Sequence, residues 1–218
     1  MSILETITNW IVSAGVVILL SVIIASWLAS YRVPKAAPVR SGDWFFVLPP
    51  WVQIVGGLGA CVLFVYLGFL LWIPLPLSMP SNVETILQLI GLGLFLVGWG
   101  LVLWARWTLG AMYGVSTSFA APLQAHHRLI QNGPYAFVRH PMYLGYWLLL
   151  VGVTLIYRTW TPLLFLVMCL ASFSRRAERE EKVLAEKFAD EWCAYVARVP
   201  RFVPRAWLGA KRGEETKR

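Results

Sequence analysis

The stretch TILQLIGLGLFLVGWGLVLWA, residues 85–105, decides the fold class of this chain. It contains no charged side chain and is apolar apart from one threonine and one glutamine. An α-helix that crosses the hydrocarbon core of a bilayer needs about 20 predominantly apolar residues. The stretch is therefore long and apolar enough to form one membrane-spanning helix.

Four further stretches are apolar: residues 7–29, 51–73, 141–157 and 160–174. The last two are short and are separated only by Arg158 and Thr159, so we expect them to form a tight helical hairpin. Strong helix formers follow, without Pro or Gly until Pro200, and predict that the last helix continues beyond the membrane. The sequence thus predicts an all-α integral membrane protein with about five transmembrane helices and a cytosolic C-terminal helix.

The composition agrees with a membrane protein. Hydrophobic residues make up 58% of the chain and charged residues only 14%, whereas soluble domains carry roughly a quarter charged residues. The net charge of +8 raises the alternative of nucleic-acid binding, but most basic residues flank the apolar stretches, where topology and anionic lipids explain them. We therefore expect membrane lipids, and no nucleic acid, among the partners.

The distribution of Lys and Arg predicts the orientation, because these residues favour cytosolic loops. The segment PLPLSMPSNV, residues 74–83, carries none, whereas the neighbouring connections and the C-terminal tail are basic. Only Arg158 departs from this pattern. We therefore expect the N-terminus outside and the C-terminus in the cytosol.

Two polar clusters stand beside the apolar stretches. The first is Arg139 and His140, directly before Pro141. Proline suits the first turn of a helix, and a helix start attracts carboxylate or phosphate groups. The alternative for Arg139 is a snorkelling side chain that marks the membrane interface. In the second cluster, RRAEREE, Arg176 and Glu180 are four apart and share a helix face, although a solvated charged helix would look the same.

Two other motifs carry weaker signals. The segment GWG, residues 98–100, lies inside the first quoted stretch, where small residues usually allow helices to pack closely. His126 and His127 lack a third metal ligand at suitable spacing, so we expect no metal site.

The segments HRLIQNGPYAFVRHPMYLG (residues 127–145) and RAEREEKVLAEKFADEWCAYVARVPRFVP (residues 176–204), on either side of the hairpin, resemble the isoprenylcysteine carboxyl methyltransferase family. That family is related to the membrane phospholipid methyltransferases, and the resemblance covers residues 125–204. It implies a methyltransferase that uses S-adenosyl-L-methionine and a lipophilic acceptor. From the apolar stretches we expect three N-terminal transmembrane helices over residues 1–107, and from the polar end of the chain a flexible tail over residues 205–218. The resemblance implies that residues 108–204 form the catalytic region.

The resemblance also implies the site residues. Cofactor-binding positions are His127, Arg128, Leu129, Ile130, Tyr135, His140, Pro141, Met142, Tyr143 and Glu180. Catalytic positions are Arg176, Glu180 and Arg139, with Arg176 matching the arginine that faces the acceptor. The related phospholipid methyltransferases also use a Gly-x-Gly in an earlier span, so the resemblance makes Gly98 and Gly100 candidate cofactor contacts.

The chemistry of these residue types agrees with the resemblance. Glu180 can bind an ammonium group, and His140 with the helix start can bind a carboxylate. We expect an isoprenylcysteine-type carboxylate as acceptor, held by Arg176 without a general base. The alternatives are a phospholipid amine, which needs a base, and a thiol. A membrane reductase using a nicotinamide dinucleotide phosphate and a non-enzymatic membrane protein are more distant alternatives.

Overall fold

The structure is a computed structural model that describes residues 3–30, 50–110 and 128–204. Its elements are α1 (Ile3–Ser30), α2 (Pro50–Leu70), α3 (Ser81–Leu109), the 3-10 helix η3 (Gly133–Ala136), α5 (Pro141–Tyr157) and α6 (Trp160–Arg198). The described part of the chain is therefore all-helical, as predicted, and α5 has the predicted bounds. Within it, Ile3–Ala25 of α1 and Ser81–Leu109 of α3 are long and apolar enough to cross a membrane.

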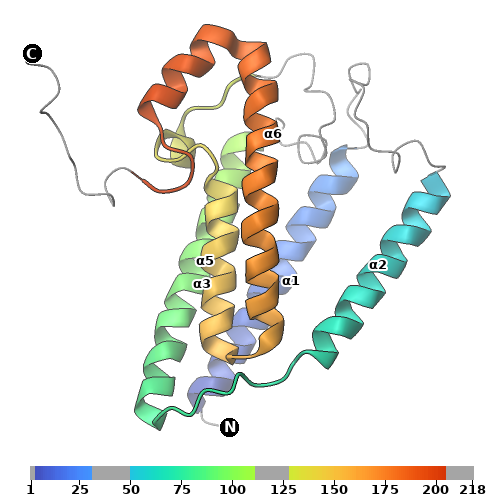
Figure 1. The fold of residues 1–218 in the computed structure, drawn as a ribbon, viewed down its shortest axis with the longest axis vertical. Helices are drawn as coiled ribbons and strands as arrows, with labels where there is room; N and C mark the ends of the chain where they lie inside the picture. Colours follow the sequence, from blue (N-terminus) through green and yellow to red (C-terminus); the bar gives the residue numbers. More distant parts are fainter. Residues whose placement is uncertain (1–2, 31–49, 111–127, 205–218) are drawn as a thin grey trace, which may run out of the picture.

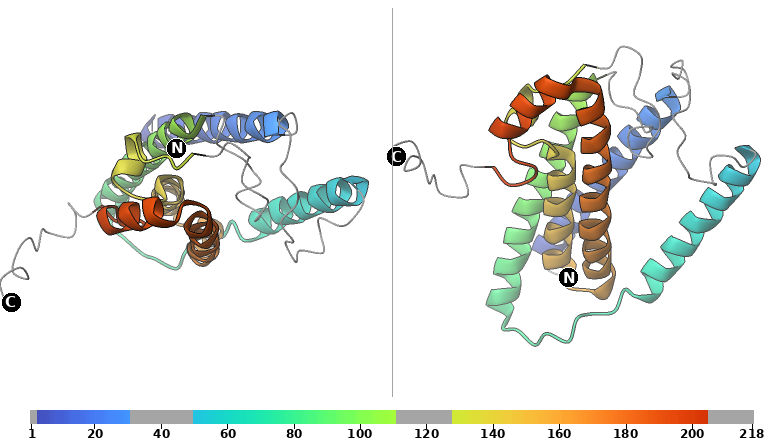
Figure 2. Two further views of the ribbon diagram at one scale, coloured as in Figure 1. Left: turned by 90° about the horizontal axis from the view of Figure 1, so that it is seen from above. Right: turned by 45° about the horizontal axis from the view of Figure 1, so that its top comes forward.

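Four of the helices form a bundle. Figure 1 shows α3, α5 and α6 running alongside one another, with α1 crossing behind them and α2 standing apart over most of its length. Figure 2 shows the same separation of α2 from above. The α1 helix is fixed to α3 by Trp99, whose indole N–H donates to the carbonyl of Gly15 at 2.9 Å. The core lies where α1, α3 and α5 meet and includes Phe95, Val102 and Leu149.

Glycines allow α3 and α5 to approach each other at backbone distance. A Cβ atom on Gly98 would lie 2.5 Å from the carbonyl oxygen of Gly145, and one on Gly91 would lie 2.7 Å from that of Gly152. Real side chains do not tolerate such contacts, so glycine is required at these crossing points. The packing role predicted for Gly98 is thus confirmed, and this glycine faces α5. A Cβ on Gly100 would meet no atom within 4 Å.

The predicted hairpin of α5 and α6 closes at the end of the bundle that carries the N-terminus. Arg158 ends α5 in a left-handed conformation with a φ of 49°. Its carbonyl accepts a hydrogen bond from Leu75 at 2.7 Å, and its guanidinium lies 4.0 Å from the carboxylate of Glu84. Arg158, the exception to the charge pattern, therefore stabilises the turn between α5 and α6.

The last helix is not continuous, contrary to the sequence prediction. At Ala189 the backbone leaves the helical region with a φ of 37°, and the following turns fold back toward the start of α5. No proline or glycine marks the reversal. Its physical reason is burial: Trp192, Tyr195 and Val199 form a second apolar cluster that a straight helix would leave in solvent.

Candidate functional site

The site begins with the short segment that leads into α5. Leu129 packs on the second apolar cluster, and the backbone carbonyl of Tyr135 accepts a hydrogen bond from the hydroxyl of Tyr195 at 2.7 Å. Gln131 bridges Arg198 and Glu191 at 3.0 and 2.9 Å. These contacts fasten the last turns of α6 to the residues that precede α5.

Residues 200–202 then cross the start of α5. The backbone N–H groups of Arg139 and His140 donate to the carbonyls of Pro200 and Arg201 at 2.9 and 3.1 Å. No side chain caps the helix start, and Pro141 occupies its first turn. The first N–H groups of a helix lack a partner within the helix, so this end can accept an anion.

Glu181 is the centre of the polar cluster. Its Oε1 atom lies 3.1 Å from Nη2 of Arg139 and 3.1 Å from Nε2 of His140. Its Oε2 atom accepts a hydrogen bond from Nη2 of Arg201 at 2.6 Å. Burial alone would raise the pKa of Glu181, but the hydrogen bonds with His140 and Arg201 and the charge of Arg139 outweigh it and lower the pKa to about 2. Glu181 is therefore charged at neutral pH and connects three segments of the chain.

Glu180 has the opposite electrostatic character. Burial raises its pKa, and this effect exceeds the lowering by the hydrogen bond from Tyr143 and by the charges of His140 and Arg176. The Tyr143 hydroxyl donates to Oε1 at 2.6 Å, and Oε2 lies 3.6 Å from Nδ1 of His140. Because burial disfavours the charged carboxylate, a cation that binds beside Glu180 would stabilise its charged form.

Aromatic rings line the polar cluster. The rings of His140 and Tyr143 stack with centroids 5.4 Å apart, and Phe173 of α6 also stacks on Tyr143, at 4.9 Å. Phe202, from the segment that crosses the start of α5, lies 5.7 Å from the His140 ring. The electron-rich faces of such rings attract cations, and the rings keep water away from the carboxylates.

The structure brings together five of the twelve residues predicted for the site. Arg139, His140 and Tyr143 lie against Glu180 and its neighbour Glu181, and Arg176 is close enough to affect the pKa of Glu180.

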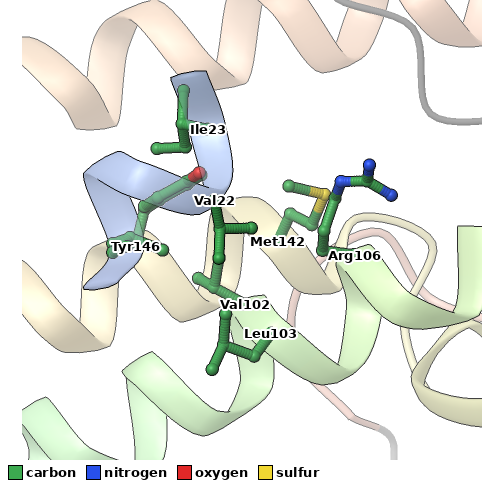
Figure 3. A pocket seen from close by; sticks show the side chains of 8 residues that line it. Val22, Ile23, Val102, Leu103, Arg106, Met142 and Tyr146 are labelled. Atoms are coloured by element: carbon green, nitrogen blue, oxygen red, sulfur yellow. The ribbon is translucent and has the colours of Figure 1, made fainter. Parts of the chain in front are cut away.

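Other predicted residues lie elsewhere. Met142 lines a pocket between α1, α3 and α5, because successive helix residues point in different directions (Figure 3). Arg128 is exposed, Leu129 serves the apolar cluster and Ile130 is half-buried. Pro141 is fully buried, Tyr135 contributes its carbonyl, and His127 lies outside the described residues.

The sequence prediction missed Glu181, Arg201 and Tyr195. Glu181 had a signal, because it directly follows Glu180 in the charged run. Arg201 and Tyr195 had none, because only the reversal at Ala189 brings them back to α5. Among the described residues, no group of three His, Cys, Asp or Glu side chains could hold a metal ion.

Comparisons with known proteins find methyltransferases. Residues 86–191 match the family described as phospholipid methyltransferase. The protein-S-isoprenylcysteine O-methyltransferase of Schizosaccharomyces pombe is 34% identical over 79 residues, which cover 36% of this chain and 34% of that protein. Protein-S-isoprenylcysteine O-methyltransferase B of Arabidopsis thaliana is 32% identical over 82 residues, 37% of this chain and 42% of that protein.

These matches span less than half the length of either relative. A solved structure, that of the eukaryotic intramembrane Ras methyltransferase (isoprenylcysteine carboxyl methyltransferase), aligns with a TM-score of 0.46 and 24% identity, over 73% of this chain and 69% of that one. Most of the polar cluster, from Arg139 to Glu181, lies inside the residues that match the family.

Proposed function

We propose that this chain, whose residues 86–191 match the phospholipid methyltransferase family, is a membrane enzyme of that family that transfers a methyl group from S-adenosylmethionine to a lipophilic acceptor. The observation that carries the proposal is the cluster of Tyr143, Glu180 and His140, which joins a half-buried carboxylate to a helix start at one end of an apolar bundle. When bound, S-adenosylmethionine supplies an electrophilic methyl group on a sulfonium, with a thioether as leaving group.

Glu180 binds the cofactor's ammonium group in this proposal. Burial raises its pKa by disfavouring the charged carboxylate, and an ammonium group bound beside it would stabilise that charged form. The hydrogen bond from Tyr143 fixes one carboxylate oxygen and leaves the other directed toward His140. The residue types present therefore fit the cationic part of the cofactor.

The start of α5 binds the cofactor's carboxylate. Its first N–H groups and the positive end of the helix dipole favour an anion there. Glu181, together with Arg201, holds the side chains of Arg139 and His140 in place beside this helix start. Glu181 is thus a positioning residue in the proposal, and Glu180 contacts the cofactor.

Arg176 holds the acceptor. A carboxylate oxygen that forms the new C–O bond carries no proton, so the reaction needs no general base; the S–CH₃ bond breaks as the C–O bond forms. What a carboxylate needs is a cation that positions it, because most of the rate enhancement comes from orientation and exclusion of water. Arg176 lies one helical turn before Glu180, whose pKa its charge lowers. The S-isoprenylcysteine named for the curated relatives is the acceptor class that this arrangement favours.

A phospholipid amine is the second candidate acceptor, and the name of the matching family favours it. Such an amine arrives protonated and must lose a proton before it attacks the methyl group. Glu180, with its raised pKa, is the residue that could accept that proton.

The membrane placement follows from the same reasoning. Helices α1, α2, α3, α5 and the first half of α6 alternate in direction (Figure 1), which supports five spans. The polar cluster and the basic connections then lie on the cytosolic side, with the N-terminus outside. We also propose that residues 108–204, which begin with the last two residues of α3, form the catalytic region and that residues 205–218 follow it as a tail.

Two neighbouring arginines give a matched test of the proposal. In detergent-purified protein, transfer of a radiolabelled methyl group is measured to an S-prenylated N-acetylcysteine, to phosphatidylethanolamine and to a small thiol. We expect the prenylated carboxylate to be methylated. Arg176→Ala is expected to lower kcat/KM about 100-fold, the scale of a hydrogen bond to a charged group, with S-adenosylhomocysteine affinity unchanged. Arg175→Ala, whose exposed guanidinium donates to the carbonyl of Ala171, is the control.

Other outcomes reject specific parts of the proposal. An equal loss of S-adenosylhomocysteine affinity in Arg176→Ala would place Arg176 in the cofactor site. Methylation of phosphatidylethanolamine alone would establish the amine acceptor. If the protein bound nicotinamide dinucleotide phosphate and not S-adenosylhomocysteine, the assigned function would change from methyltransferase to reductase.

A further inference from the structure

The segment that follows α6, residues 199–204, returns beside the start of α5 (Figure 1). The centroid of the Phe202 ring lies 4.5 Å from that of the Trp147 ring. Trp147 stands six residues after Pro141, which is about 9 Å along α5. Phe202 therefore reaches past the start of α5, to a level that belongs to the apolar stretch of this helix.

Neighbouring side chains of this segment have different surroundings. Arg201 donates to the carboxylate of Glu181 at 2.6 Å, whereas Phe202 packs on Trp147. Val203, the next residue, is 43% exposed. The polar side chain is thus held at the polar cluster while the apolar side chains lie beside α5, the division expected of a segment at the surface of a membrane.

The backbone of the segment suits a medium of low polarity, in which each unpaired N–H or carbonyl group costs free energy. Pro200 and Pro204 have no N–H group. The carbonyls of residues 199–201 accept hydrogen bonds from Arg139 and His140 at distances between 2.9 and 3.2 Å. Few polar backbone groups therefore have to lose water when the segment enters lipid.

We propose that Phe202 and Val203 insert into the cytosolic leaflet of the membrane, where phospholipid acyl chains cover them. The proposal rests on the membrane span proposed for α5 and is independent of the methyltransferase function. Acyl chains are the expected occupant because Phe202, through its contact with Trp147, extends the apolar surface of a helix that already faces lipid. The insertion anchors the returning end of α6 and places the polar cluster at the level of the lipid headgroups.

Three exposed valines give a matched test: Val203 in the segment, Val97 inside α3 and Val183 on the cytosolic half of α6. Each is replaced singly by cysteine, in a protein whose three natural cysteines are replaced by alanine, and is labelled with an environment-sensitive fluorophore. The labelled proteins are placed in vesicles of phosphatidylcholine and phosphatidylglycerol. Some of the lipids carry a nitroxide quencher on the acyl chain, either close to the glycerol or at the middle of the chain.

The fluorophore at position 203 is expected about 5–10 Å below the headgroup–acyl boundary, the depth of interfacial apolar segments. Nitroxides close to the glycerol should therefore quench it more strongly than nitroxides at the middle of the chain. The fluorophore at position 97 should show the opposite order. The fluorophore at position 183 should keep its fluorescence with both.

A second measurement uses the wild-type protein and needs no substitution. The protein is photolysed in the same vesicles with phosphatidylcholine that carries a diazirine on the acyl chain close to the glycerol. Trypsin then releases one peptide that begins at Phe202 and one that begins at Val183, because each follows a basic residue. The first peptide should carry the lipid label and the second should not.

Fluorescence at position 203 that neither nitroxide quenches, beside the expected quenching at position 97, would overturn the inference. Equal quenching at positions 203 and 183 would also overturn it, because the cytosolic half of α6 would then lie as deep as the segment. An unlabelled Phe202 peptide would overturn it even if a cysteine variant failed to fold. Lack of quenching at position 97 as well would overturn the proposed membrane placement together with the inference. None of these measurements depends on S-adenosylhomocysteine, so the proposed function is tested separately.

Discussion

Arg201 donates a hydrogen bond to the Glu181 carboxylate at 2.6 Å, although the two residues are 20 positions apart. Glu181 lies on α6, which reverses direction at Ala189 and ends at Arg198, and Arg201 lies in the segment that follows. The Glu181 carboxylate also contacts Arg139 and His140 at the start of α5. The Glu181 side chain therefore joins the middle of α6, the segment that follows α6 and the start of α5. The geometry of the proposed cofactor site depends on this junction.

Glu181→Gln should destabilise the protein by about 2 kcal/mol, because it removes the charge from hydrogen bonds that three cationic or donor groups make. Thermal unfolding in detergent measures the change. Glu178→Gln is the control, since that carboxylate is 57% exposed and lies 3.6 Å from Arg201, and an exposed pair contributes about 0–1 kcal/mol. Equal losses of unfolding free energy in Glu181→Gln and Glu178→Gln would show that Glu181 stabilises the fold no more than an exposed ion pair does.

The lowered pKa of Glu181 predicts an acid-sensitive stability. A carboxyl whose pKa falls from 4.5 in the unfolded chain to about 2 in the folded protein stabilises the fold above pH 4.5, and the contribution is lost as the pH falls toward 2. The difference in unfolding free energy between wild type and Glu181→Gln should therefore be constant above about pH 5 and shrink below it. A difference that stays constant down to pH 3 would contradict the assigned ion pairs.

The reversal at Ala189 predicts a stabilising glycine. Its φ of 37° lies where side chains are strained and glycine is not. Ala189→Gly should therefore stabilise the protein by up to about 1 kcal/mol. Ala194→Gly, on the exposed helical face beyond the reversal, should cost about 1 kcal/mol. If both substitutions destabilise alike, α6 does not reverse at this residue.

The contact between α3 and α5 predicts different outcomes for two glycines of the GWG segment. Gly98→Ala should destabilise the protein by about 1–3 kcal/mol, because its Cβ would lie 2.5 Å from the backbone of α5. Gly100→Ala should be neutral or stabilising, because the space beside it is open and alanine favours helix. Thermal unfolding of both variants checks this, and equal costs would contradict the close helix crossing.

Much of the fold can be predicted from the sequence, because the length of an apolar stretch and the residues that begin or end a helix are local signals. Pro141 begins α5 as predicted, and Arg158 and Thr159 separate α5 from α6. The reversal at Ala189 could not be predicted, because alanine favours helix and only long-range burial of Trp192 and Tyr195 explains the strained backbone.

The arrangement of the candidate site was predictable only in part. The family resemblance implied that His140, Tyr143 and Glu180 share a site, and the structure brings these three side chains together. Met142 stands between two of them in the sequence but points toward α1 and α3, because each helix residue turns about 100° from the last. Arg201 reaches the cluster only through the reversal, so no local pattern could place it there.

Calorimetric binding of S-adenosylhomocysteine to wild type, Glu180→Gln and Glu186→Gln tests the central claim most directly. We predict binding by the wild type and by Glu186→Gln, whose carboxyl is exposed on α6. Glu180→Gln should bind at least tenfold more weakly, because it lacks the charge that holds the ammonium group. Wild-type affinity should also fall at acidic pH, as protons compete for a Glu180 carboxylate of raised pKa. Unchanged affinity in Glu180→Gln would contradict the proposed site, and no binding by the wild type would contradict the proposed function.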